Sequence, residues 1–277
     1  MTIERIDARF AALRNEGRAA FVAYVMGGDP DAETSLAILA GLAPAGADLI
    51  ELGMPFSDPM ADGPPIQRAA RRALAGGMTT RGVLELAARF RATDTATPVV
   101  LMGYLNPILN HGFDAFAEAA AAAGVDGLIV VDCPPEEADP LADALEAQSL
   151  ALIRLVTPTT DQARLVVVAR RTRGFLYYVS VAGVTGAGEA DAEAIAPAVA
   201  RARAASGLPV AVGFGIRTPE RAAMVARVAD AAVVGSALVD RVGEAIAQNR
   251  DPVSKLLDTA AGLAQAVRSA RVAPVVE

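Results

Sequence analysis

The amino-acid sequence predicts an α/β protein, a (β/α)8 (TIM) barrel, and three observations support this prediction. Short apolar segments of strand length recur along the 277 residues. Helix-length segments rich in Ala, Leu and Arg separate them. The spacing suits parallel strands joined by crossover helices, and the total length suits a barrel of about 250 residues. We therefore expect one domain over residues 1–277.

The predicted strands are apolar on both faces, since apolar and polar residues do not alternate along them. They span residues 21–26, 48–52, 98–102, 127–131, 150–156, 175–180, 209–213 and 231–235. The clearest helical segments between them span residues 32–42, 113–123, 136–147, 191–205 and 218–228. An open doubly wound sheet would also alternate strands with helices, so it remains the structural alternative.

Two additional helices are expected around this repeat. An amphipathic helix over residues 3–14 precedes the first strand and is placed to plug the bottom of the barrel. A short extra helix begins at Gly235-Ser236, directly after the eighth strand.

The composition excludes several classes of protein. Hydrophobic residues make up 53% of the chain, which rules out a largely disordered protein. Cys133 and His111 are the only residues of their types, so an internal disulfide and a zinc site built on several histidines are excluded. Triads that need a histidine have one candidate at most. Chemistry carried by carboxyl groups is favoured.

Charge and hydropathy indicate a cytoplasmic protein that binds neither nucleic acid nor membrane. The net charge is -7 and the isoelectric point is about 4.9, so a phosphate backbone would find no basic surface. The first ten residues lack the pattern of a secretory signal. The longest uncharged stretch, residues 95–113, contains prolines and glycines that a lipid-facing helix would not tolerate together.

Glu51 is the first candidate for catalysis. It ends the second predicted strand among apolar residues, at the end of a barrel where such enzymes place their chemistry. Desolvation there would raise its pKa toward the range that suits a general acid and base. A structural glutamate paired with an arginine is the alternative.

The loop that follows Glu51 is unusually rich in prolines and acids. It contains Asp58 before Pro59 and Asp62 before Gly63. Both acids suit turns, and their spacing does not show which of them faces a site.

Glycines after the last strands indicate a phosphate-binding site. Gly215 follows the seventh strand, Gly235 and Ser236 follow the eighth, and Gly186 lies in the long loop after the sixth. Backbone N–H groups at such glycines, together with a helix N-terminus, bind anions. Loops after strands seven and eight form the recurrent phosphate site of these barrels. Glycines that merely turn the chain are the alternative.

The residues from Glu51 to Pro64, ELGMPFSDPMADGP, resemble the signature of the tryptophan synthase α subunit family. Further matching motifs follow in order over nearly the whole chain: Gly27-Gly28-Asp29-Pro30, Tyr104-Leu105-Asn106-Pro107, Asp132-Cys133-Pro134-Pro135-Glu136-Glu137, Gly183-Val184-Thr185-Gly186, Gly213-Phe214-Gly215-Ile216 and Gly235-Ser236-Ala237. Met26 and Val181 depart from the family pattern in flanking positions.

The resemblance implies retro-aldol cleavage of indole-3-glycerol phosphate to indole and glyceraldehyde 3-phosphate. In the family pattern, Glu51 is the general acid and base, and Asp62 stabilises positive charge on the ring N–H. Tyr177 resembles the tyrosine that supports the glutamate, and Thr185 the residue that orders the aspartate on loop closure. The other implied residues bind phosphate (Gly186, Gly215, Gly235 and Ser236) or surround the indole (Tyr24, Tyr104, Ile129 and Phe214).

The resemblance also implies a partner. No metal or organic cofactor is expected in this chain. Pyridoxal phosphate is expected only on a tryptophan synthase β subunit, which would receive the indole within an α2β2 heterotetramer. We expect that subunit to touch residues 55–64 and 132–137.

Three alternatives stay open at this point. A stand-alone indole-3-glycerol phosphate lyase would share the chemistry and lack the partner. A sugar-phosphate isomerase or epimerase could use the same phosphate-binding barrel. A non-catalytic interaction subunit would be expected to have lost an acid or the phosphate-binding glycines, and this chain has retained them.

Overall fold

The computed structural model describes residues 3–180, 192–213 and 215–271. Its strands form a closed barrel in which each strand pairs in parallel with the next and β8 pairs with β1. The strands are β1 (Ala20–Met26), β2 (Leu49–Gly53), β3 (Val99–Gly103), β4 (Gly127–Val130), β5 (Ala151–Val156), β6 (Leu176–Val179), β7 (Val210–Gly213) and β8 (Ala231–Val234). The predicted barrel is confirmed, and an open doubly wound sheet is excluded.

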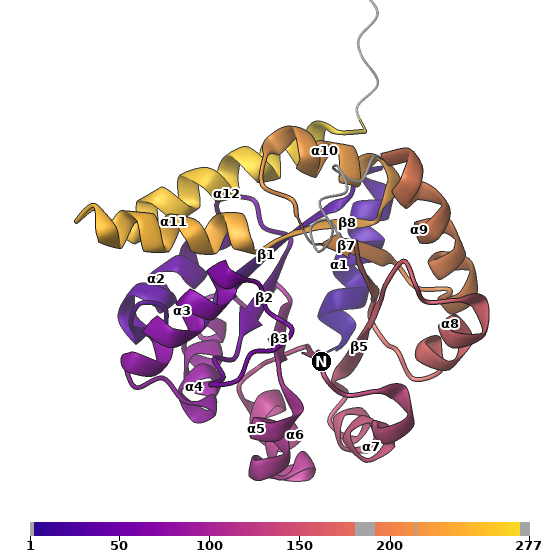
Figure 1. Cartoon of the computed structure of the whole chain (residues 1–277), viewed down its shortest axis with the longest axis horizontal. Helices are drawn as coiled ribbons and strands as arrows, with labels where there is room; N and C mark the ends of the chain where they lie inside the picture. The colour runs from indigo at the N-terminus through magenta and orange to yellow at the C-terminus, as the bar shows by residue number, and fades with distance from the viewer. Residues whose placement is uncertain (1–2, 181–191, 214, 272–277) are drawn as a thin grey trace, which may run out of the picture.

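Apart from α1, the helices surround the strands on the outside (Figure 1). The helices are α1 (Ile3–Asn15), α2 (Ala32–Leu42), α3 (Pro64–Ala75), α4 (Thr80–Arg91), α5 (Leu105–His111), α6 (Phe113–Ala122), α7 (Asp139–Ala147), α8 (Gln162–Ala169), α9 (Ala192–Ser206), α10 (Pro219–Val228), α11 (Ser236–Ala247) and α12 (Pro252–Ser269), with a 3-10 turn η1 (Pro135–Glu137) before α7. The extra helix expected after β8 is α11, and at 12 residues it is longer than expected. His111 is the last residue of α5. Among the described residues, no helix is both long and apolar enough to cross a membrane.

The apolar core has two parts. One lies between the strands and the outer helices, and the other fills the barrel. Ile6, Phe10 and Leu13 of α1 belong to the inner part, and the ring of Phe10 lies 5.7 Å from that of Phe175. Helix α1 therefore plugs the barrel, as its amphipathic sequence predicts.

Aspartates link the amino ends of neighbouring strands to one another. Asp48, Asp126 and Asp230 stand directly before β2, β4 and β8. Each accepts a hydrogen bond from a backbone N–H of the preceding strand, from Phe21 at 2.9 Å, Val99 at 2.7 Å and Val210 at 2.8 Å. Each also pairs with arginine. At the amino ends of the strands, these charged side chains therefore stabilise the barrel by joining neighbouring strands.

The adjacent residues Tyr177 and Tyr178 of β6 belong to different parts of the core. Tyr177 belongs to the core inside the barrel, and Tyr178 to the core between the strands and the helices. Adjacent residues of a strand face opposite sides, so only Tyr177 is directed toward the barrel axis.

Candidate active site

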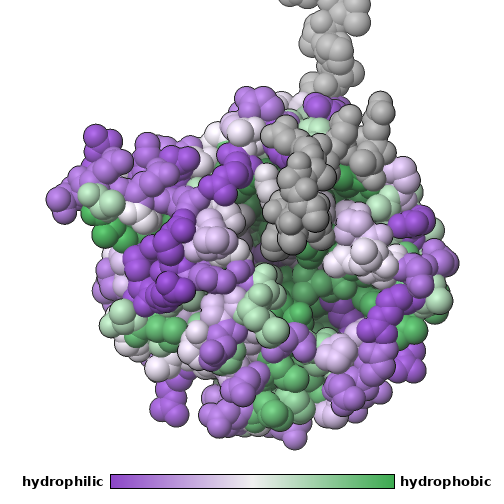
Figure 2. Space-filling view, in the orientation of Figure 1, coloured by the Kyte–Doolittle hydropathy of each residue, from purple (hydrophilic) through white to green (hydrophobic). Residues whose placement is uncertain are grey.

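A cavity of about 550 Å³ opens at the carboxyl ends of the strands. Figure 2 shows a largely hydrophobic hollow near the middle of this face. The cavity is lined by Tyr24, Glu51, Asp62, Gly63, Pro64, Pro65, Ile66, Met102, Tyr177, Val179, Gly215, Ile216, Arg217, Val233, Gly235 and Ser236. Seven residues that the sequence analysis selected therefore share one cavity: Tyr24, Glu51, Asp62, Tyr177, Gly215, Gly235 and Ser236.

Glu51 supplies a fully buried polar group to the cavity. Its side chain is 0% exposed, and neither carboxyl oxygen has a hydrogen-bond partner among the described residues. The arginine partner considered as an alternative is thus not found in the described part of the chain. Burial raises the pKa of Glu51 to about 8, so the group is mostly protonated at neutral pH.

Asp62 lies in the same cavity on the loop between β2 and α3. Burial raises its pKa to about 6, and hydrogen bonding from the Tyr104 hydroxyl opposes this shift. At neutral pH the carboxyl of Asp62 is therefore mostly ionised. Two acids in one cavity thus hold different protonation states, an arrangement typical of acid–base sites.

Contacts with Tyr104 and Gln67 hold the loop that carries Asp62 in place. The N–H of Ala61 donates to the Tyr104 hydroxyl at 3.0 Å, and the Tyr104 ring lies 5.2 Å from the ring of Phe56. The side-chain amide of Gln67 donates to the Asp62 carbonyl at 2.9 Å. Gln67 has no signal of its own in the sequence, although Gly63-Pro64-Pro65 before it is a recognisable helix start.

Asp58 lies apart from this cavity. It is exposed and accepts a hydrogen bond from the hydroxyl of Ser57, its neighbour in the chain. The structure therefore separates the two acids of the loop, which their spacing in the sequence did not: Asp62 faces the cavity and Asp58 faces solvent.

Gly215, Gly235 and Ser236 line the cavity together at the carboxyl ends of β7 and β8. Gly215 has a φ of 75°, a conformation that favours glycine. Ser236 is the first residue of α11, so the unpaired N–H groups and the dipole of that helix begin beside it. An anion could bind here through backbone groups.

Arg217 also lines the cavity, and the sequence analysis did not select it. Its guanidinium pairs with Asp240 of α11, which also pairs with Arg68 of α3 at 3.0 Å. Apolar walls formed by Met102, Val179 and Val233 were missed as well, since their pattern is that of ordinary core residues.

The remaining predicted residues have different positions. Tyr104 is buried and holds the Asp62 loop without lining the cavity. Ile129 is also buried, inside the barrel, where it pairs in register with the cavity residue Met102. Thr185, Gly186 and Phe214 lie outside the described residues.

Two glycines leave room for the tyrosines beside Glu51. A Cβ atom on Gly53 would overlap the Tyr24 hydroxyl, and one on Gly213 would overlap the Tyr177 hydroxyl. Because both glycines end strands, they allow each phenol to extend over the neighbouring strand. These glycines therefore shape the space above Glu51.

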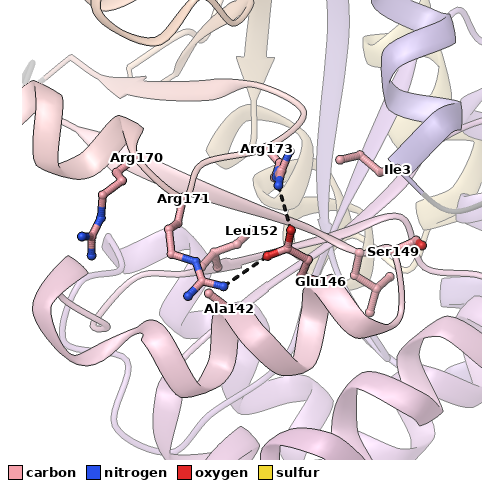
Figure 3. A pocket seen from close by; sticks show the side chains of 9 residues that line it. Ile3, Ala142, Glu146, Ser149, Leu152, Arg170, Arg171 and Arg173 are labelled. Carbon is pink, nitrogen blue, oxygen red and sulfur yellow. Dashed lines mark hydrogen bonds and ion pairs between the residues drawn. The ribbon is translucent and has the colours of Figure 1, made fainter.

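A second cavity of about 290 Å³ lies before β5 and β6, among residues of α7 and the α8–β6 connection. Figure 3 shows Glu146 between two arginines, and it accepts hydrogen bonds from Arg171 at 3.2 Å and from Arg173 at 2.8 Å. Arg171 also pairs with Asp143 at 2.6 Å. The acids and bases there bind one another, as in an ion-pair cluster that joins surface elements.

Comparisons with known proteins agree with one another. The sequence model of the family described as "Tryptophan synthase alpha chain" matches residues 10–268. The tryptophan synthase alpha chain of Phenylobacterium zucineum (strain HLK1) is 70% identical over 271 residues, which cover 98% of each chain. That of Caulobacter vibrioides (strain NA1000 / CB15N) is 68% identical over 98% of this chain and 99% of its own. The crystal structure of tryptophan synthase subunit alpha from Legionella pneumophila str. Paris matches with a TM-score of 0.90 and 42% identity, covering 96% of this chain and 98% of its own.

The fit between Gly213 and Tyr177 predicts the outcome of a double-mutant cycle. We expect Gly213→Ala to lower the free energy of unfolding by about 1–3 kcal/mol, since the new methyl group overlaps the Tyr177 hydroxyl. In a Tyr177→Ala background, which removes both the hydroxyl and the ring carbons that the methyl group would meet, the same substitution should cost markedly less. Urea unfolding of the four proteins measures the difference. Gly262→Ala is the control, because a Cβ on Gly262 meets nothing within 4 Å; equal costs for Gly213→Ala in both backgrounds would refute the fit.

Proposed function

The chain belongs to the tryptophan synthase alpha chain family, and we propose how its cavity carries out the reaction of that family. The enzyme is a carbon–carbon lyase. It cleaves indole-3-glycerol phosphate by a retro-aldol reaction to indole and glyceraldehyde 3-phosphate. The observation that carries the proposed mechanism is the pair of acids, Glu51 and Asp62, held in different protonation states in one cavity.

Glu51 acts first as an acid and then as a base. With a pKa of about 8 it holds its proton at neutral pH and gives it to C3 of the indole ring. The carboxylate left behind is desolvated, so it is a strong base for the proton of the side-chain hydroxyl next to the ring. Loss of that proton forms the aldehyde, and the electrons of the broken C–C bond return to the indole. Glu51 ends the cycle protonated, as it began.

Asp62 stabilises the charge that this sequence creates. Protonation at C3 places positive charge on the ring, and an ionised Asp62 beside the ring N–H lowers the energy of that state. The Tyr104 hydroxyl helps to keep the carboxylate ionised, since it opposes the rise in pKa that burial causes. The N–H of Ala61 fixes this hydroxyl in turn.

Substrate binding divides the cavity into a polar and an apolar part. The phosphate is held by backbone groups at Gly215, Gly235 and Ser236, at the start of α11. The indole lies among Tyr24 and the apolar residues Met102, Val179 and Val233. Tyr104 and Ile129 support this wall from behind. Gly186 and Phe214 belong to the same proposal from the sequence motifs alone, as does Thr185 for the ordering of Asp62.

Tyr177 supports Glu51 from across the barrel. It is buried and lines the cavity. Burial and the nearby Glu51 raise the pKa of its hydroxyl, so it stays a neutral donor throughout the reaction. A donor in this position stabilises the Glu51 carboxylate when it forms.

We further propose that the chain works with a tryptophan synthase β subunit in an α2β2 heterotetramer, in the cytoplasm. Met60, at the tip of the loop over residues 55–64, is 85% exposed, and Leu109 of α5 is 58% exposed. Pro134, Glu136 and Glu137 are exposed on the same carboxyl-end face of the barrel. Exposed apolar side chains beside an active-site mouth favour a protein partner there. The indole then passes to the partner, which carries the pyridoxal phosphate. This chain uses no metal or organic cofactor of its own in the proposed mechanism.

The two protonation states predict a bell-shaped pH profile for kcat/KM. We expect the rate to rise through about pH 6, where Asp62 loses its proton, and to fall above about pH 8, where Glu51 loses the proton it must donate. Initial rates of indole release at constant ionic strength measure both limbs. A rate that keeps rising between pH 7 and pH 10 would show that Glu51 does not start as an acid.

Substitution of Glu51 separates catalysis from binding. Glu51→Gln should lower the rate of cleavage by roughly 10²–10⁴, because an amide neither gives nor takes the proton. Substrate affinity should change little, since Gln has the shape of a protonated Glu. Single-turnover cleavage and equilibrium binding give the two quantities. Glu85→Gln, on the exposed face of α4, is the matched control; an unchanged rate in Glu51→Gln would remove Glu51 from the mechanism.

Addition of the β subunit tests the proposed assembly. We expect slow indole release by this chain alone and a strong increase when a tryptophan synthase β subunit is added, because a partner docked on the exposed side of the Asp62 loop would favour the closed site that excludes water. Asp58→Asn should weaken that increase, since Asp58 faces outward on this loop. Fast release that the β subunit does not change would instead identify a stand-alone lyase.

A further inference from the structure

Tyr24 occupies a position that an apolar wall of the indole site does not require. It lies on β1 in register with Glu51 of β2. It lines the cavity together with Glu51 and Asp62 and is 7% exposed. A phenylalanine would serve equally well as a flat apolar surface. Burial of a phenol hydroxyl costs free energy unless the group finds a polar partner.

The hydroxyl of Tyr24 is directed across the top of β2. It covers the Cα of Gly53, where a Cβ atom would overlap it. Gly53 is two residues beyond Glu51 and therefore on the same face of the strand. The phenol thus ends above the carboxyl of Glu51, whose two oxygens have no partner among the described residues.

Five titratable groups surround the Tyr24 hydroxyl. Besides burial, the nearby Asp62, Glu51, Tyr104 and Asp29 raise the pKa of Tyr24, and Tyr177 faces it across the barrel. Asp29 is held by Arg72 through two hydrogen bonds of 2.7 Å. The Tyr104 hydroxyl already accepts from Ala61. Asp62, Glu51 and Tyr177 remain, and of these Asp62 and Glu51 are the two acids assigned to the reaction.

We propose that the Tyr24 hydroxyl links the two acids in the substrate-bound site, accepting a hydrogen bond from protonated Glu51 and donating one to ionised Asp62. This inference rests on the proposed function, because it takes both acids as the reacting pair. A phenol has one donor and an acceptor oxygen, so it fits between a neutral and an ionised carboxyl group. Tyr24 is then a positioning residue that acts through Glu51 and Asp62.

The link stabilises one combination of protonation states over the others. With Glu51 protonated and Asp62 ionised, both hydrogen bonds form. Loss of the Glu51 proton breaks the first bond, and protonation of Asp62 weakens the second. The hydroxyl therefore raises the pKa of Glu51 and lowers that of Asp62, which widens the pH range in which the enzyme is ready to react.

Tyr24→Phe removes this link by deleting one oxygen atom. We expect the acidic limb of the kcat profile, which reports the substrate-bound enzyme, to move up and the basic limb to move down, each by about half to one pH unit, so that the bell becomes narrower. Tyr178→Phe is the matched control, since this phenol lies outside the barrel. A lower rate with both limbs unchanged would show that Tyr24 only packs against the substrate, and would overturn the proposal.

A titration without substrate turnover makes the result independent of activity. The ¹³C carboxyl signal of Glu51, assigned through Glu51→Gln, should titrate at a lower pH in Tyr24→Phe than in the unchanged protein with a bound inert substrate analogue. In an Asp62→Asn background, which lacks the ionised acceptor, Tyr24→Phe should shift the titration much less. Equal shifts in both backgrounds would refute the link between the two acids. If the pH profile of the unchanged enzyme is not bell-shaped, the proposed roles of Glu51 and Asp62 are refuted. If that profile is bell-shaped and Tyr24→Phe does not narrow it, only the role of Tyr24 is refuted.

Discussion

The desolvation of one carboxyl group is the constraint on which the active site depends. Glu51 is fully buried, and no described residue forms a hydrogen bond with either of its oxygens. In water its proton would be lost at neutral pH, and the group could not act as the initial acid. Closure of the barrel and the apolar side chains inside it keep water away from this carboxyl. The fold thus sets the chemical state of the residue as well as its position.

The barrel separates stability from chemistry along its axis. At the amino ends of the strands, aspartates bind backbone N–H groups and arginines, so their charges are neutralised. At the carboxyl ends, Glu51 and Asp62 lack arginine partners among the described residues. Acidic side chains are thus structural at the amino ends of the strands and reactive at the carboxyl ends. The difference lies in whether a cation is placed beside the acid.

Much of the fold follows from the sequence, because strands buried on both faces leave a simple pattern of apolar segments. Glu51 was recognisable as well, since a lone acid at the end of such a segment needs an explanation. Asp58 and Asp62 were indistinguishable, because both precede residues that favour turns and only tertiary contacts direct one of them inward. Adjacency in the sequence likewise does not show which of Tyr177 and Tyr178 faces into the barrel, and their packing in the fold does. Arg217 and Gln67 gave no signal, because their roles come from α11 and from a backbone carbonyl that folding brings near.

The plug formed by α1 has a consequence for the opposite end of the barrel. Ile6, Phe10 and Leu13 fill the interior from below, beneath the layers of side chains that lead up to Glu51. Without them, a file of water molecules could enter along the axis and hydrate the carboxyl from underneath. The first helix therefore excludes water from the barrel axis and keeps the surroundings of the Glu51 carboxyl at a low dielectric constant. Through it, a segment that never meets the substrate helps to decide whether the glutamate carries its proton.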